Sequence, residues 1–250
     1  MEIWQGIVLI LVGTIAGFVN VMAAGGSMIT VPAMVFMGLP GPVANGTNRI
    51  AILAQNITAV TTFFRKGFSD FKLSLSLSLC ALPGAIAGAF IGTRLEGVWF
   101  NRTLAIIMLI MMVIMSIKKK SASADSPVAG VSRHRLIFGH LLMVLAGLYG
   151  GFIQIGIGFI LLPILHRVIG LDMVRANMHK VFIIASYTIA ALAIFITQVE
   201  IAWRLGICLA IGNSIGAWMG AHMAIKKGEG LIKAILNVVL VLFIIKLLFF

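Results

Sequence analysis

The sequence has 250 residues, of which 61% are hydrophobic and 10% are charged, and its formal net charge is +12. A soluble globular domain has about 25% charged residues, so this composition excludes an ordinary soluble fold and predicts a polytopic membrane protein. The apolar stretches are long and do not alternate with polar residues, as barrel strands of about ten residues would. We therefore expect an all-α bundle of membrane helices, and we expect the basic residues to orient it in the bilayer rather than to bind nucleic acid.

In chain order, the sequence contains eight apolar segments long enough to cross the bilayer, since a crossing needs about 20 residues at about 1.5 Å each. They lie at 3–24, 43–64, 71–93, 99–117, 136–154, 177–197, 203–225 and 231–250. Two more segments, 28–38 and 159–170, are too short to cross easily, and glycines bound each of them on one side. The N-terminus has an acidic residue and no basic region, so we expect a first spanning helix there rather than a cleaved signal peptide.

A polar stretch at 118–135 divides the chain into a first repeat at 1–117 and a second at 136–250. Sliding the first half by 131 to 132 positions superimposes glycines, prolines and asparagines of the two halves. The matches are Gly25 with Gly156, Pro32 with Pro163, Gly38-Leu39 with Gly170-Leu171, Ala44-Asn45 with Ala176-Asn177, and Gly84 and Gly88 with Gly216 and Gly220. Matches at one spacing across several elements indicate an internal duplication.

The loop charges favour inverted repeats of five elements each. If both short segments cross, four segments with excess Lys and Arg fall on one side, at 65–72, 118–135, 166–180 and 226–233. The other side receives Glu2, Arg49 and the loops 94–102 and 198–204. An excess of positive charge marks the cytoplasmic side, so 118–135 is a predicted cytoplasmic linker. The alternative is eight crossings in parallel repeats, with re-entrant short segments.

The glycine-rich breaks are the first candidate site residues. Short, interrupted hydrophobic segments at matching positions of two halves indicate the binding site of a transporter. The N-terminus of each half-helix carries about +0.5 charge and suits an anion. We assign Gly25, Gly26, Gly156 and Gly158 to such a site. For Gly84, Gly88, Gly216 and Gly220, four residues apart on helices, we expect tight helix packing instead.

Polar residues beside the breaks complete the predicted site: Asn20, Ser27, Thr47, Asn48, Arg49, Gln154, His179 and Lys180. Intramembrane cations are costly and commonly functional, so we expect Arg49 to grip an oxyanion with two hydrogen bonds and Lys180 to act as a point charge. The alternative for both is snorkelling to the interface. Asn45 and Asn177 have the pattern of helix N-caps.

His179 is a candidate for proton coupling, because histidine titrates near neutral pH. The simpler interpretation is a polar residue at the head of a helix. Proton or counter-ion coupling is therefore an expectation that the sequence leaves open, and so is the oligomeric state.

Several segments together resemble the sulfite exporter family, also described as TauE/SafE-like or TSUP. The first is GFVNVMAAGGSMITVPAMVFMGLPGPVANGTNRIAIL at 17–53, with its glycine break, proline, Gly38-Leu39-Pro40 turn and Gly46-Thr47. The others are GGFIQIGIGFILLPIL at 150–165 and FFRKGFSDFK at 63–72. The resemblance implies secondary transport of sulfur-containing anions, such as sulfite, sulfonates or related organic acids, across the plasma (inner) membrane. Asn48 and Arg49 depart from the common pattern of small hydroxyl or apolar residues.

Nothing in the sequence predicts catalysis. No plausible Ser-His-Asp set, zinc-binding spacing or P-loop is present, and Cys80 and Cys208 lie in apolar segments as packing residues. We therefore expect a multi-pass transporter of a small anion that works by alternating access, with no metal and no cofactor. The alternative is a passive anion channel of the same architecture. The exact anion and the direction of transport are not readable from the sequence.

Overall fold

The computed structural model describes residues 3–23, 25–95, 97–116 and 133–249. These residues form helices joined by short turns, with no strand among them, which confirms the predicted all-α class. The helices are α1 (Ile3–Ala23), α2 (Ser27–Phe36), α3 (Gly41–Arg65), α4 (Phe71–Arg94), α5 (Gly97–Ser116), α6 (Arg133–Phe152), α7 (Gly158–Pro163), the π-helical η1 (Ile164–Ile169), α8 (Met173–Gln198) and α9 (Trp203–Phe249). Of the predicted linker at 118–135, residues 118–132 lie outside the described residues, and residues 133–135 begin α6.

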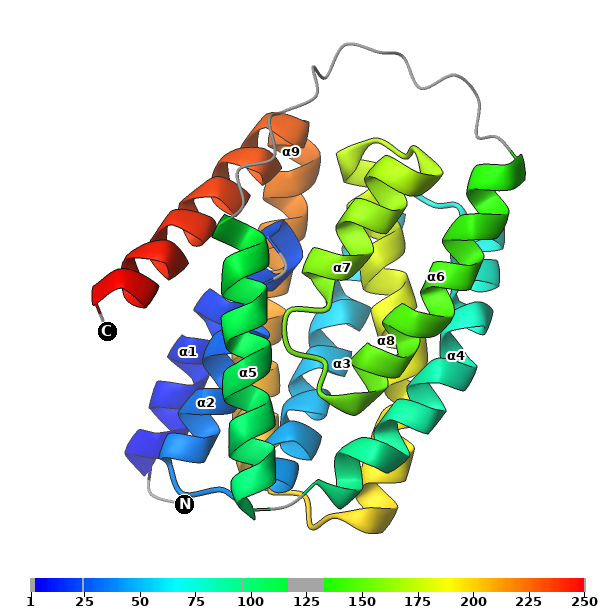
Figure 1. The fold of residues 1–250 in the computed structure, drawn as a ribbon. Helices are drawn as coiled ribbons and strands as arrows, with labels where there is room; N and C mark the ends of the chain where they lie inside the picture. The colour runs from blue at the N-terminus through cyan, green and yellow to red at the C-terminus, as the bar shows by residue number, and fades with distance from the viewer. Residues whose placement is uncertain (1–2, 24, 96, 117–132, 250) are drawn as a thin grey trace.

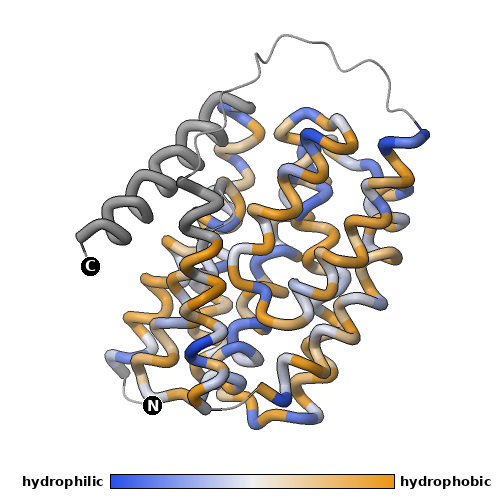
Figure 2. The backbone as a smooth tube through the Cα atoms, viewed as in Figure 1, coloured by the Kyte–Doolittle hydropathy of each residue, from blue (hydrophilic) through white to orange (hydrophobic). Residues whose placement is uncertain are grey.

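Four of the described helices are long and apolar enough to cross a membrane, at 4–22, 71–94, 133–152 and 173–198. Between the ends of these helices, the side chains that face outward are mostly apolar; Leu11 and Leu145, for example, are more than half exposed. Figure 2 shows hydrophilic residues at the ends of the bundle and a further group inside it. The arrangement suits a hydrocarbon solvent, in which helices satisfy their own backbone hydrogen bonds. The chain is a multi-pass membrane protein.

Both predicted breaks are present. α1 ends at Ala23 and α2 begins at Ser27, while α6 ends at Phe152 and α7 begins at Gly158. Figure 1 shows α2 running back against α1 and α7 running back against α6, so that each pair forms a hairpin whose turn lies between the two ends of the bundle. The second turn uses the left-handed backbone region, with φ of +62° at Gln154 and +70° at Gly156.

The C-terminal part differs from the prediction. The segments 203–225 and 231–250 were expected as separate elements, yet α9 is one helix of 47 residues. Figure 1 shows it rising through the bundle and then folding back on itself. The separation was predicted because the basic segment 226–233 interrupts the apolar sequence. A glycine inside a helix costs only about 1 kcal/mol, and the assigned helix continues through these residues, but its two parts run in opposite directions, as the two predicted segments would.

Matching helices of the two halves run in opposite directions. In Figure 1, α1 and α3 rise where α6 and α8 descend, and α4 descends where the first part of α9 rises. The packing is reciprocal as well, because α1 packs mainly against α9 and α4 mainly against α6. Five-element inverted repeats at 1–117 and 136–250 stay a prediction, which this arrangement supports.

The glycines four residues apart pack helices together, as predicted. A Cβ on Gly84 would lie 2.0 Å from the backbone oxygen of Val144, and one on Gly88 would lie 2.0 Å from that of Leu148. At the equivalent interface, a Cβ on Gly216 would lie 2.0 Å from Thr14 O. A Cβ on Gly220 would lie 3.1 Å from Phe18 O. Small residues at such positions allow helix backbones to approach closely.

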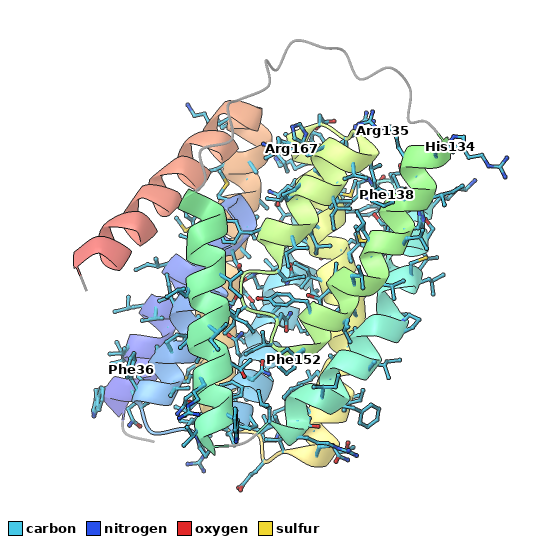
Figure 3. The ribbon with its side chains drawn as sticks, viewed as in Figure 1. Phe36, His134, Arg135, Phe138, Phe152 and Arg167 are labelled. Carbon is cyan, nitrogen blue, oxygen red and sulfur yellow. The ribbon has the colours of Figure 1, made fainter. Side chains whose placement is uncertain are left out.

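Basic residues gather at one end of the bundle. Figure 3 shows Arg135 and Arg167 at this end and Phe36 at the other. The Arg135 guanidinium donates to Val168 O at 2.9 Å and to Arg167 O at 2.8 Å, and so ties the start of α6 to the end of η1. The turn between α3 and α4 and the bend of α9 lie at the same end in Figure 1.

Candidate functional site

The two breaks meet inside the bundle. Ser27, the first residue of α2, is almost fully buried, and its Oγ accepts a hydrogen bond from the backbone N–H of Gly156 at 3.3 Å. These residues lie 129 positions apart in the chain, so the contact joins the two predicted repeats. Unwound backbone inside a membrane is tolerated where protein or a water-filled cavity surrounds it, and this contact supplies such surroundings.

A small cavity of about 10 Å³ lies beside this contact. Its lining comes from both halves of the chain: Asn20, Ser27, Ile52, Gln55, Asn56, Gln154, Ile157, Gly158, Lys180 and Ile184. The volume has room for about one water molecule. Among the residues predicted for the site, five line the cavity, namely Asn20, Ser27, Gln154, Gly158 and Lys180.

Gln55 and Asn56 were not among the predicted site residues, although they line the cavity. Gln55 Oε1 accepts hydrogen bonds from Asn20 Nδ2 and Asn213 Nδ2, each at 3.2 Å. Asn20 Oδ1 in turn accepts from the Gly26 N–H at 3.2 Å. The available signal was the amide pair at positions 55 and 56 in an otherwise apolar stretch, one turn beyond Ile52 on the same helix. Asn213, which donates to Gln55, was also absent from the predicted site. It lies close to Gly216 and Gly220 in the sequence, for which only helix packing was predicted.

Lys180 lies on α8 with its ammonium at the C-terminal end of α1. Its Nζ donates to Asn20 O and to Val21 O, each at 3.0 Å. The last carbonyls of a helix have no partner within it and carry the negative end of the helix dipole. The ammonium therefore caps α1, and Lys180 also lines the cavity. The two bonds use two of the three N–H groups of the ammonium.

Arg49 does not line the cavity. Its guanidinium donates to Gly150 O at 3.2 Å, Gly151 O at 2.5 Å and Phe152 O at 3.4 Å, which are the last residues of α6. It also donates to Gln154 Oε1 at 3.1 Å and stacks on the Phe195 ring at 4.3 Å. Arg49 is fully buried, so snorkelling does not describe it. The sequence predicted that the guanidinium would bind an oxyanion. In the structure its terminal nitrogens donate to backbone carbonyls instead.

Three predicted polar residues contact protein groups away from the cavity. Thr47 Oγ1 accepts from the Ala202 N–H at 3.1 Å. Asn48 Oδ1 accepts from Thr30 Oγ1 at 2.7 Å. His179 Nδ1 lies 2.7 Å from Ser74 Oγ.

Three predicted glycines, Gly25, Gly26 and Gly156, belong to the breaks without lining the cavity. A Cβ on Gly26 would lie 1.9 Å from Ala16 O, so this glycine permits close packing of the break on α1. The structure therefore gives Gly26 a packing role, and a binding role for these three glycines stays a prediction.

Asn45 and Asn177 were expected as N-caps, and this was wrong. α3 begins after Pro40, and α8 begins after Asp172, whose carboxylate accepts from the Val174 and Arg175 N–H groups. Both asparagines are buried about one turn inside their helices. Asn45 Nδ2 donates to Phe152 O at 2.9 Å, which again links α3 to the end of α6.

The comparisons with known proteins agree with this picture. The family model "Sulfite exporter TauE/SafE" matches residues 9–247. The chain is 27% identical over 234 residues to a probable membrane transporter protein of Sinorhizobium, covering 94% of this chain and 88% of that one. It is 26% identical to one of Haemophilus influenzae, over 90% and 88% of the two chains. It is 25% identical to YfcA of Escherichia coli, over 97% and 89%.

No solved structure matches the chain. The family model covers nearly the whole sequence, and the relatives match along almost all of their own length. The chain belongs to the sulfite exporter TauE/SafE family of membrane transporters.

Proposed function

We propose that this transporter carries a small anion through the cavity between the two breaks, and that the anion is a sulfur oxyanion, a sulfonate or a related organic acid. The observation that carries the proposal is Lys180, the one charged residue among the described residues that line the cavity. It is buried, and within the described part of the chain its ammonium donates to the neutral carbonyls of Asn20 and Val21. A buried cation without a counter-charge is costly, and a bound anion would supply that charge.

Alternating access is the mechanism that best suits this site. The lining comes from α1, α2 and α3 on one side and from α7, α8 and the second break on the other. Transporters with inverted repeats bind substrate where the repeats meet, near discontinuous helices, and expose it to each side by rocking one repeat against the other. The opposite directions of matching helices support this proposal.

A passive channel of the same architecture is less well supported. The cavity holds about 10 Å³, and its polar lining residues Ser27, Gln55 and Gln154 are at most 2% exposed. A channel needs a continuous aqueous path, whereas an enclosed site between two halves is what alternating access requires. We further propose that the basic end of the bundle faces the cytoplasm in the inner membrane, following the positive-inside rule.

The test is transport of radiolabelled sulfite by the purified protein in sealed vesicles, compared between the parent and Lys180→Gln. A hydrogen bond to a charged group is worth about 1.5–3 kcal/mol, so we expect the apparent affinity to fall about tenfold or more. Uptake should saturate with concentration, as carrier-mediated transport does.

The matched control is Arg175→Gln, which removes an exposed cation from the same helix, where Arg175 pairs with Asp172 at 3.4 Å. This variant should transport at the parent rate. Equal transport by Lys180→Gln and the parent would place the anion elsewhere. Flux of neutral solutes without any response to anions would refute the proposal.

A further inference from the structure

We infer that the cavity selects an oxyanion with a single negative charge and one hydrogen left to donate, such as hydrogen sulfite, over the fully deprotonated dianion. The inference rests on the proposed function and adds the protonation state of the substrate to it. It comes from the charges and hydrogen-bonding groups that line the cavity.

The charge count favours a monoanion. Lys180 contributes the one positive charge of the lining. The terminal nitrogens of Arg49 already donate to the carbonyls that end α6 and to Gln154. Within the described residues, the one ion pair between side chains joins Asp172 and Arg175 on the exposed start of α8. A dianion would therefore bring one negative charge more than the cavity can balance, in surroundings where an unpaired charge is expensive.

The hydrogen-bond network fixes which way the amides face. Gln55 Oε1 accepts from both Asn20 and Asn213, so Gln55 must turn its NH₂ group away from both of them. Ser27 Oγ accepts from the Gly156 N–H, which leaves the hydroxyl hydrogen free to donate. Together with the third N–H of Lys180, these groups supply donors for the oxygen atoms of an anion.

Asn56 supplies the opposite kind of group. Its Nδ2 donates to Ile52 O at 2.7 Å, and a carbonyl can only accept, so this bond fixes the amide orientation. Its Oδ1 is buried and has no hydrogen-bond partner among the residues that the structure describes. Buried acceptors are normally paired. An acceptor in the lining of an anion cavity repels a bare oxyanion but binds one that still carries a hydrogen.

The apolar part of the lining limits size. Ile52, Ile157 and Ile184 line the cavity next to the polar groups, and the present volume holds about one water molecule. An oxyanion can enter only if these side chains move outward. A compact anion requires the smallest movement, which favours a single oxyanion group over a bulky organic acid.

The experiment measures binding to the full-length protein in detergent by titration calorimetry, with sulfite and methanesulfonate as the probes. Both are monoanions at low pH, but methanesulfonate has no hydrogen to donate and does not change its charge as the pH rises. We expect apparent sulfite affinity to fall about tenfold per pH unit above the point where hydrogen sulfite loses its proton. Methanesulfonate affinity, which reports any titration of the protein itself, should change much less.

The variant Asn56→Leu tests the acceptor. We expect the preference for hydrogen sulfite over methanesulfonate, measured at low pH, to fall about tenfold, which corresponds to about 1.4 kcal/mol. Methanesulfonate binding should persist in this variant, which shows that the cavity has formed. The matched control is Asn177→Leu, because Asn177 is buried on α8 outside the lining and neither of its amide atoms has a partner within the described ranges. This control should keep the parent preference.

Two results would overturn the inference while leaving anion transport in place. One is parent protein whose sulfite affinity follows that of methanesulfonate through the whole pH range. The other is Asn56→Leu with the parent preference and intact methanesulfonate binding. If neither probe binds at any pH, the proposed function fails, and the inference fails with it.

Discussion

Arg49 and Lys180 play reciprocal parts in the two halves of the chain. Arg49 on α3 donates to the carbonyls that end α6, and Lys180 on α8 donates to the carbonyls near the end of α1. Each cation therefore stabilises the negative end of a broken helix in the opposite half. The two residues differ in their other surroundings. Lys180 lines the cavity, whereas Arg49 stacks on the ring of Phe195.

This difference predicts that Arg49→Gln damages folding more than recognition. The shorter, neutral side chain cannot reach all of the buried carbonyls that the guanidinium now binds, and breaking a buried charged network costs about 3–5 kcal/mol. We expect a markedly lower melting temperature in detergent. Arg102→Gln is the control, because Arg102 also stacks on an aromatic ring, Trp99 at 5.5 Å, but is exposed. An unchanged melting temperature for Arg49→Gln would show that the capping contacts contribute little.

At the residue scale, sequence reasoning found the chemical groups but not their partners. Asn20, Ser27 and Lys180 were predicted from their places beside the breaks or at the head of a helix, and they line the cavity. The bonds of Arg49 to carbonyls more than 100 positions away depend on how α3 meets α6, which no local pattern records. Gln55 and Asn56 were left out because they lie about two turns deeper in the helix than the polar residues at its head, which the prediction favoured.

Two interfaces at the element scale depend on glycine. α4 packs on α6 through Gly84, and α1 packs on α9 through Gly216, each with helix backbones in direct approach. The spacing of four residues and the repeat match made this packing readable from the sequence. Helix ends were less readable, because Pro40 and Asp172 begin helices one turn before the asparagines that the pattern favoured.

Gly84→Val should disrupt the α4–α6 interface. The first carbon of the new side chain would lie 2.0 Å from Val144 O, and backbone atoms cannot move aside as a flexible side chain can. We expect α4 and α6 to separate, with a large loss of folded protein on size-exclusion chromatography. Ala87→Val, one turn farther along α4 on the exposed side, adds the same kind of bulk toward lipid and should be tolerated. Comparable yields of the two variants would contradict this account of the interface.

At the scale of the whole molecule, the direction of the second half supports one of the two topologies that the sequence allowed, the inverted repeats, which stay a prediction. Helix directions place the α3–α4 turn and the bend of α9 at one end, and the α8–α9 turn at the other. Eight crossings with parallel repeats would separate the first two segments. The sequence could predict the inverted arrangement only through its loop charges, because hydropathy alone does not show whether a short segment crosses or turns back.

Cysteine accessibility in sealed cells tests this arrangement. Cys80 and Cys208, which are unpaired, are first replaced by alanine, and single cysteines are then introduced at Ser69, Lys227 or Glu200, all of which are exposed. A reagent that cannot cross the membrane should label Glu200→Cys from outside, and should label Ser69→Cys and Lys227→Cys only after the membrane is opened. The reason is the excess of Lys and Arg at 65–72 and 226–233, which holds both segments on the cytoplasmic side. Labelling of Lys227→Cys from outside together with protection of Ser69→Cys would support eight crossings. It would also contradict the inverted relation between the two repeats, on which the proposal of alternating access at the two breaks depends.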